Sequence, residues 1–129
     1  MDRDEELKQW IDLPANNLKT AEHIAETMYP VPDEIVCNLC QQAAEKYLKC
    51  FLFYKGIEYP RIHDLPKLLK LCIDISDDFT AFIKKCGFLN KYGIMPKYPN
   101  DLQIIDDDVK MSIKFAKEIQ EFVLAKVKL

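Results

Sequence analysis

The chain has 129 residues, of which 49% are hydrophobic and 30% charged, and its formal net charge at pH 7 is −3. This length fits one domain, and the composition argues against both a disordered tail and a membrane protein. Lys or Asp interrupts the longest apolar runs before they reach the ~20 residues that span a bilayer. Because the net charge is negative, any affinity for nucleic acid must come from a local basic patch.

The N-terminus and the cysteines both indicate a cytoplasmic protein. Residues 1–6 are mostly acidic and lack the cationic start and apolar stretch of a secretory signal. The five cysteines are an odd number spread through expected helices, which favours buried, reduced thiols over a disulfide framework. Cys37 and Cys40 have the two-residue spacing of zinc ligands, but no second pair follows at a suitable distance. We therefore expect no metal site.

The first half of the chain predicts two helices. Apolar residues at spacings of three and four predict a first helix over residues 14–29, with Pro14 in its first turn. Prolines at positions 30 and 32 then break the helix. The acidic residues Asp33 and Glu34 begin a second helix, which ends near Lys55 because a glycine follows.

The second half predicts shorter helices and a long final one. Residues 57–63 have no helical period and contain a proline, so they form a loop, after which Asp64 caps a third helix. A fourth helix covers residues 76–86, residues 90–101 form an ordered surface loop, and a last helix covers residues 106–127. The prediction is an all-α, up-and-down antiparallel bundle of four to five helices that forms one domain over residues 1–129, with its core at about 10–127.

The second helix carries a polar stripe on an otherwise apolar surface. At 100° per residue, Asn38, Gln42, Glu45, Lys46 and Lys49 fall on one narrow stripe. In one interpretation the stripe is a solvated face, with the pairs Gln42–Lys46 and Glu45–Lys49 contributing ~0.2–0.5 kcal/mol each. In the other it lines a cleft, where Lys46 and Lys49 meet phosphate oxygens while Gln42 and Asn38 fix a base or sugar.

The loop after this helix contains a second group of candidate residues. Arg61 and His63 alternate across Ile62, immediately before the capping Asp64. A histidine near an arginine and two lysines has the groups needed to hold a phosphate, and neutral imidazole exchanges a proton near pH 7. His63 is therefore the candidate catalytic residue, and a hydrogen-bonded structural role for it remains open.

These residues resemble the HEPN domain, and the resemblance covers the chain from about residue 10 to residue 127. In the first helix, residues 15–21 are similar to the family's pattern, with Asn17 where Asp is usual. The other matching strings are residues 41–49 (QQAAEKYLK), residues 60–65 (PRIHDL), Lys91 with Tyr92, and residues 97–99 (KYP).

The resemblance implies a nucleotide- or phosphate-binding module that acts as a homodimer. It also implies a small nucleotidyltransferase as the partner, in a pair of the toxin–antitoxin kind. We expect no resident cofactor. Lys97 replaces the Arg that is common in the last string. The expected ligand-binding residues are Asn38, Gln42, Lys46, Lys49, Arg61, His63 and Lys97.

Two alternative functions remain. Other HEPN members are metal-independent ribonucleases that rely on an Arg and a His four to six residues after it, whereas Arg61 stands only two positions before His63. This departure favours a non-catalytic binding module over an enzyme. The third possibility is a purely structural dimerisation or protein-interaction module, for which Phe51, Phe53 and Tyr54 would supply apolar surface.

Overall fold

The computed structural model describes residues 1–93 and 106–128. Within these ranges no strand is present, and the chain is all-α as predicted. The helices are α1 (Arg3–Thr27), α2 (Asp33–Tyr54), α3 (Leu65–Ile75), the 3-10 helix η1 (Asp77–Phe82), α4 (Ile83–Asn90) and α5 (Asp106–Lys126).

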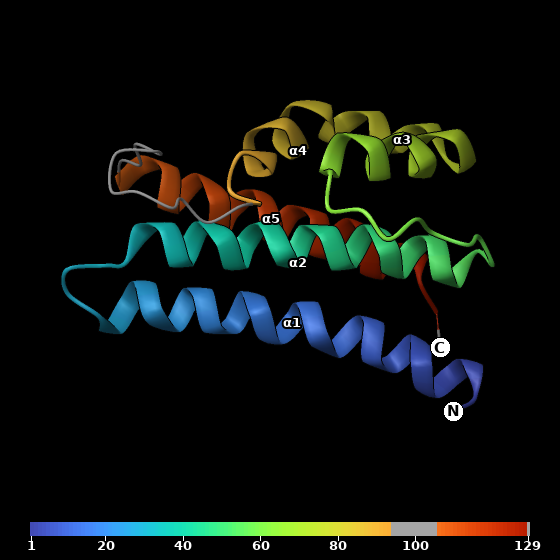
Figure 1. Cartoon of the computed structure of the whole chain (residues 1–129), viewed down its shortest axis with the longest axis horizontal. Helices are drawn as coiled ribbons and strands as arrows, with labels where there is room; N and C mark the ends of the chain where they lie inside the picture. The colour runs from blue at the N-terminus through green and yellow to red at the C-terminus, as the bar shows by residue number, and fades with distance from the viewer. Residues whose placement is uncertain (94–105, 129) are drawn as a thin grey trace.

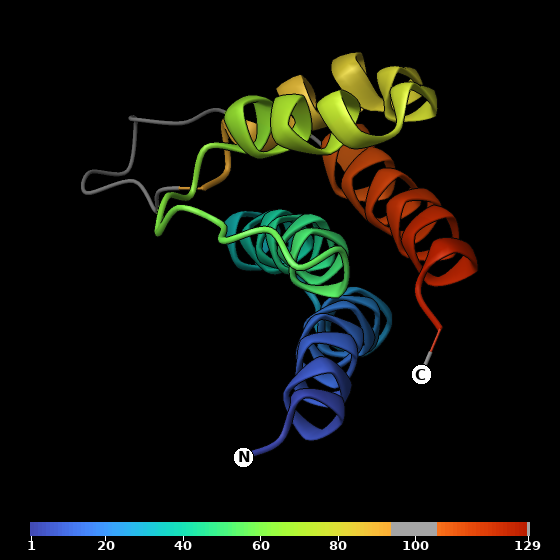
Figure 2. The same ribbon diagram turned by 90° about the vertical axis from the view of Figure 1, so that its right-hand side faces the viewer.

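The helix α2 is the centre of the bundle and contacts α1, α3, α4 and α5. Figure 1 shows α1 running antiparallel along one side of α2, while α3 and α4 cover the other side. Seen along the axis of α2, in Figure 2, α5 lies beside both α2 and the α3–α4 layer. The position of α2 explains why more than half of its circumference is apolar, as the sequence predicts.

The connection from α2 to α3, residues 55–64, runs back beside α2 instead of leaving at its end (Figure 1), and we call it the return loop. Gly56 has φ +73°, a left-handed conformation that glycine adopts without strain. Gly56 N donates to Phe53 O at 3.0 Å and Ile57 N to Leu52 O at 2.9 Å, which is the hydrogen-bond pattern of a Schellman motif. This reversal places the end of the loop beside the middle of α2.

The start of α3 is capped as predicted. The Asp64 carboxylate accepts a hydrogen bond from Lys67 N at 3.1 Å. Leu65 N donates to the Asn90 side chain at 2.9 Å, which ties this start to the end of α4. The end of the return loop is therefore held by two independent contacts.

The core forms where α2 meets the other helices. The Phe79 ring of η1 lies 4.6 Å from Phe51 on α2 and 4.9 Å from Phe122 on α5, measured between ring centroids. Phe51 is fully buried, and Phe53 and Tyr54 are partly buried. The expectation that these residues supply exposed apolar surface for a partner is therefore wrong for Phe51, while Phe53 and Tyr54 pack against the core and keep part of their surface exposed.

The five cysteines are free and buried, in agreement with the sequence. Burial raises the pKa of each thiol, to about 12 for Cys50, Cys72 and Cys86. The thiols are consequently protonated near neutral pH and pack as small apolar groups.

Two helix boundaries differ from the prediction. The first helix begins at Arg3, because the Asp2 carboxylate caps it by accepting from Glu5 N at 2.8 Å and because Leu7 is buried in the core. Pro14 consequently lies inside α1 and not in its first turn. The predicted fourth helix is divided into η1 and α4, and residues 94–101 of the predicted surface loop lie outside the described residues.

None of the described helices is long and apolar enough to cross a membrane. The cytoplasmic location stays a prediction.

Candidate functional site

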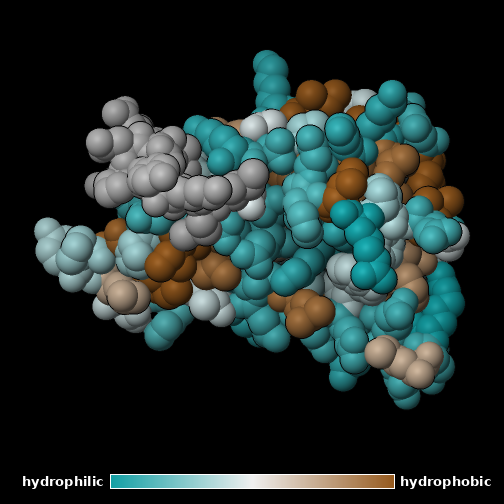
Figure 3. All heavy atoms as spheres, viewed as in Figure 1, coloured by the Kyte–Doolittle hydropathy of each residue, from teal (hydrophilic) through white to brown (hydrophobic). Residues whose placement is uncertain are grey.

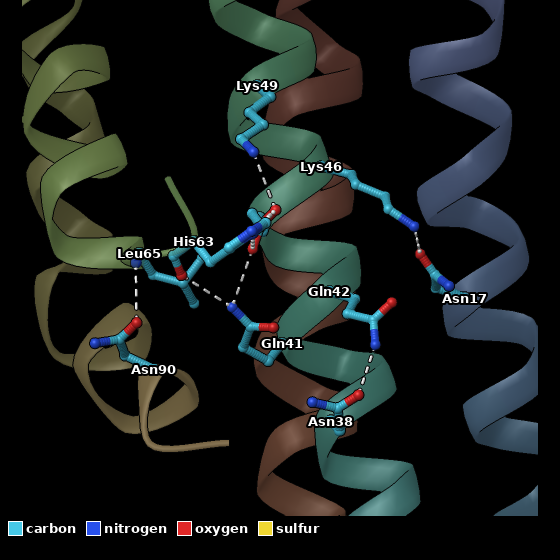
Figure 4. Close-up of polar contacts among 10 residues, drawn as sticks. Asn17, Asn38, Gln41, Gln42, Lys46, Lys49, His63, Leu65 and Asn90 are labelled. Carbon is cyan, nitrogen blue, oxygen red and sulfur yellow. Dashed lines mark hydrogen bonds and ion pairs between the residues drawn. The ribbon is translucent and has the colours of Figure 1, made fainter. Parts of the chain in front are cut away.

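The polar side chains of α2 form two rows, each with a spacing of four residues that keeps its members on one side of the helix. Figure 4 shows one row on the side of α1 and the other on the side of the return loop. We call them the α1 row and the loop row, and together the polar face. The α1 row contains Asn38, Gln42 and Lys46, and the loop row contains Gln41, Glu45 and Lys49.

The Glu45 carboxylate is the centre of the loop row and is almost completely buried, with the whole residue 8% exposed. Lys49 Nζ donates to its Oε2 at 3.1 Å, which confirms the predicted pair. His63 Nδ1 lies 3.0 Å from each of the two carboxylate oxygens. Gln41 Nε2 donates to Glu45 Oε1 at 3.4 Å and to His63 O at 3.3 Å. These contacts neutralise a buried charge and fasten the return loop to α2.

The contact with Glu45 fixes the orientation of the His63 imidazole. An ionised carboxylate only accepts hydrogen bonds, so Nδ1 carries a proton and the neutral ring has its lone pair on Nε2. The His63 side chain is 77% exposed, and Nε2 is the ring nitrogen left without a protein partner among the described residues. A carboxylate orients many general-base and metal-binding histidines in this way.

The α1 row is held by different partners. Asn38 Nδ2 donates to Tyr92 O at 2.7 Å, and Gln42 Nε2 donates to Asn38 Oδ1 at 2.5 Å. Asn38 therefore anchors the chain just after α4, and Gln42 pairs with it and not with Lys46. Lys46 Nζ donates to Asn17 Oδ1 on α1 at 2.8 Å. Burial lowers the pKa of Lys46, and the nearby Glu45 carboxylate opposes that shift.

The polar face carries a local excess of positive charge. The two rows contain two ammonium groups, those of Lys46 and Lys49, and one carboxylate, that of Glu45. Protonation of His63 would add a further positive charge. Figure 3 shows a largely hydrophilic surface over the middle of α2. This face can attract an anion although the whole chain is negative.

The structure brings together only some of the predicted ligand-binding residues. Lys49 and His63 meet at Glu45, whereas Lys46 points away from them toward α1 (Figure 4). Arg61 is exposed on the return loop, two residues before His63. Lys97 lies outside the described residues.

A small pocket adjoins His63 and has a volume of about 220 Å³. Among the described residues, His63, Asp64, Asn90 and Gly93 line it. A Cβ atom at Gly93 would lie 3.2 Å from Gln41 Nε2, so glycine leaves the room that Gln41 needs to reach Glu45 and His63. The pocket is large enough for a phosphate group beside the imidazole.

The sequence reasoning missed two residues that the structure places in the site. Gln41 lay outside the stripe, although its position four residues before Glu45 indicates a contact with it. Asn17 was a departure from a family pattern with no assigned role, and nothing in α2 indicates that Lys46 reaches it. Within the described ranges, no group of three or more His, Cys, Asp or Glu residues could hold a metal ion.

The fold and the polar face define a small all-α module with a locally cationic surface on its central helix. Residues 7–127 match the HEPN domain, and the chain belongs to this family. It is similar to ST0689, an archaeal HEPN homologue, with 26% identity, a TM-score of 0.74, and coverage of 99% of this chain and 100% of that one. TT1696 from Thermus thermophilus has the same fold, with 23% identity, a TM-score of 0.75, and coverage of 98% and 100%. No functionally curated protein matches the chain.

The contact with Glu45 predicts the tautomer of neutral His63. We expect ¹⁵N NMR of the neutral imidazole side chains to show the His63 proton on Nδ1. In Glu45→Ala the ring loses this acceptor, and the proton should move largely to Nε2, the form that free histidine prefers. The exposed His23 on α1 is the internal control and should be the same in both proteins. An Nε2–H tautomer for His63 in the wild-type protein would contradict the described geometry.

Proposed function

We propose that the chain is a nucleotide- or phosphate-binding HEPN module. The observation that carries this proposal is the excess of ammonium groups over carboxylates on the polar face, next to an accessible imidazole. A face of this kind attracts phosphate oxygens, which accept hydrogen bonds from lysine, arginine and protonated histidine.

The proposal assigns a separate role to each side of the polar face. Lys46 contributes a positive charge on the side of α1, and Gln42 has an amide oxygen that can accept from a base or sugar. On the side of the return loop, His63 and Arg61 contact a phosphate group of the ligand. Lys49 binds the Glu45 carboxylate that holds His63 in place, and it adds positive potential on this side. Lys97 remains a predicted contact.

Nucleotide binding predicts an increase in thermal stability. We expect millimolar ATP or GTP to raise the melting temperature, because a ligand at 100 times its Kd stabilises the folded state by about 2.7 kcal/mol. Lys46→Gln should reduce the increase, measured against its own melting temperature without ligand. Lys19→Gln, at an exposed position on α1, is the matched control and should respond like the wild type. No increase with either nucleotide would rule out the binding function.

The module is further proposed to act as a homodimer and as the partner of a nucleotidyltransferase, in a pair of the toxin–antitoxin kind. Membership of the HEPN family supports this proposal. Large apolar side chains that remain exposed support it as well: Leu13 on α1 is 50% exposed, Met28 just after α1 is 51% exposed and Ile83 on α4 is 56% exposed.

Sedimentation velocity and co-purification test these two associations. We expect the purified chain to sediment as a dimer and a co-expressed nucleotidyltransferase from the same operon to elute with it. A monomer at micromolar concentration would contradict the first association. Separate elution of the two proteins would contradict the second.

A metal-independent ribonuclease is the second candidate, and the Glu45–His63 contact favours it. With Nδ1 held by Glu45, Nε2 of His63 can take the proton of a ribose 2′-hydroxyl. The 2′-oxygen then attacks phosphorus, the bond from phosphorus to the 5′-oxygen breaks, and water supplies the proton to the 5′-oxygen. Arg61, exposed two residues before His63 on the return loop, would supply positive charge to the crowded phosphate.

Incubation with RNA in the presence of a chelator tests this candidate. Cleavage should yield 2′,3′-cyclic phosphate ends and should be lost in His63→Ala. His23→Ala changes the other histidine, exposed on α1, and is expected to leave cleavage unchanged. Intact RNA, or equal cleavage by His63→Ala, would exclude the ribonuclease.

A further inference from the structure

The two lysines of the polar face differ in the charge of their partners. Lys49 donates to the carboxylate of Glu45, whereas Lys46 crosses to α1 and donates to the neutral amide of Asn17. Figure 4 shows the Lys46 and Asn17 side chains pointing toward each other. Asn17 is the only hydrogen-bond partner of Lys46 Nζ in the part of the chain that the structure describes. The difference in partner charge leaves Lys46 with a positive charge that its own contact does not neutralise.

The cost of holding this charge favours an anion as a third partner. Lys46 is partly buried, and burial lowers the pKa of its ammonium group. The Glu45 carboxylate compensates part of this effect, but it already binds Lys49 directly. A bound anion would supply the missing negative charge and a hydrogen-bond acceptor together.

The Asn17 amide also has donors to offer. Its oxygen must face Lys46, because the opposite orientation would place the NH₂ group against three ammonium N–H groups. Nδ2 therefore points away from Nζ, and among the described residues it donates to no protein group. Lys46 uses one of its three N–H groups on Asn17. Free donors of both side chains thus lie close together, at a partly exposed place between α1 and α2.

We propose that Asn17 and Lys46 together form an anion seat on the α1 side of the polar face that binds one phosphate group of the ligand, with Asn17 as the residue that makes it possible. This inference rests on the proposed nucleotide-binding function and adds a residue from α1 to it. A carboxylate at position 17 would form an internal ion pair with Lys46 and remove the Nδ2 donors. The amide instead positions the ammonium group without neutralising it.

Two substitutions at position 17 separate charge from packing. Asn17→Asp keeps the size and the contact with Lys46 but neutralises the ammonium group, while Asn17→Ala removes the contact and leaves the charge. We expect calorimetric titration with ATP, and with pyrophosphate, to give the order wild type, Asn17→Ala, Asn17→Asp from tightest to weakest. The loss in Asn17→Asp should be about tenfold or more. Melting curves should show Asn17→Asp folded, with a melting temperature at or above that of the wild type.

The results distinguish this inference from the proposed function. If Asn17→Asp binds as tightly as the wild type, or loses no more affinity than Asn17→Ala, Asn17 does not control the charge at the site and the inference is wrong. Nucleotide binding by the wild-type protein would then still stand. If the wild type binds neither ATP nor pyrophosphate, the proposed function itself fails.

Discussion

The buried carboxylate of Glu45 is the interaction on which the candidate site depends. A carboxylate in the interior of a helical bundle must be neutralised and hydrogen-bonded, because its desolvation costs several kcal/mol. Lys49 meets part of this requirement from the next turn of α2, and His63 meets the rest from the return loop. One charge thereby fastens the return loop to α2 and fixes the orientation of the imidazole.

Most of the fold can be predicted from local signals in the sequence. The left-handed Gly56 ends α2, Asp64 begins α3, and apolar spacing identifies the face of α2 that enters the core. Pro14 misled the prediction because proline is most common in a first turn. Pro14 lies inside α1 because Asp2 caps the helix and Leu7 is buried in the core. The preference of proline for a first turn takes neither of these effects into account.

The site was less predictable, for a physical reason. Helical geometry alone places polar groups on one face of α2 and pairs Glu45 with Lys49. It contains no information on which segment packs against that face. The contacts of Glu45 with His63 and of Lys46 with Asn17 join residues 18 and 29 positions apart, and each depends on the path of another segment. These contacts decide which ammonium group stays unneutralised.

The length of the return loop fixes where its histidine meets α2. The number of residues between Gly56 and Asp64 determines the position along α2 at which the His63 imidazole lies. One inserted or deleted residue would shift that point by up to ~3.4 Å, more than a hydrogen bond tolerates. Changes of length here would therefore separate the histidine from its carboxylate even with every side chain retained. The spacing between Gly56 and Asp64 is consequently as much a requirement of the site as His63 itself.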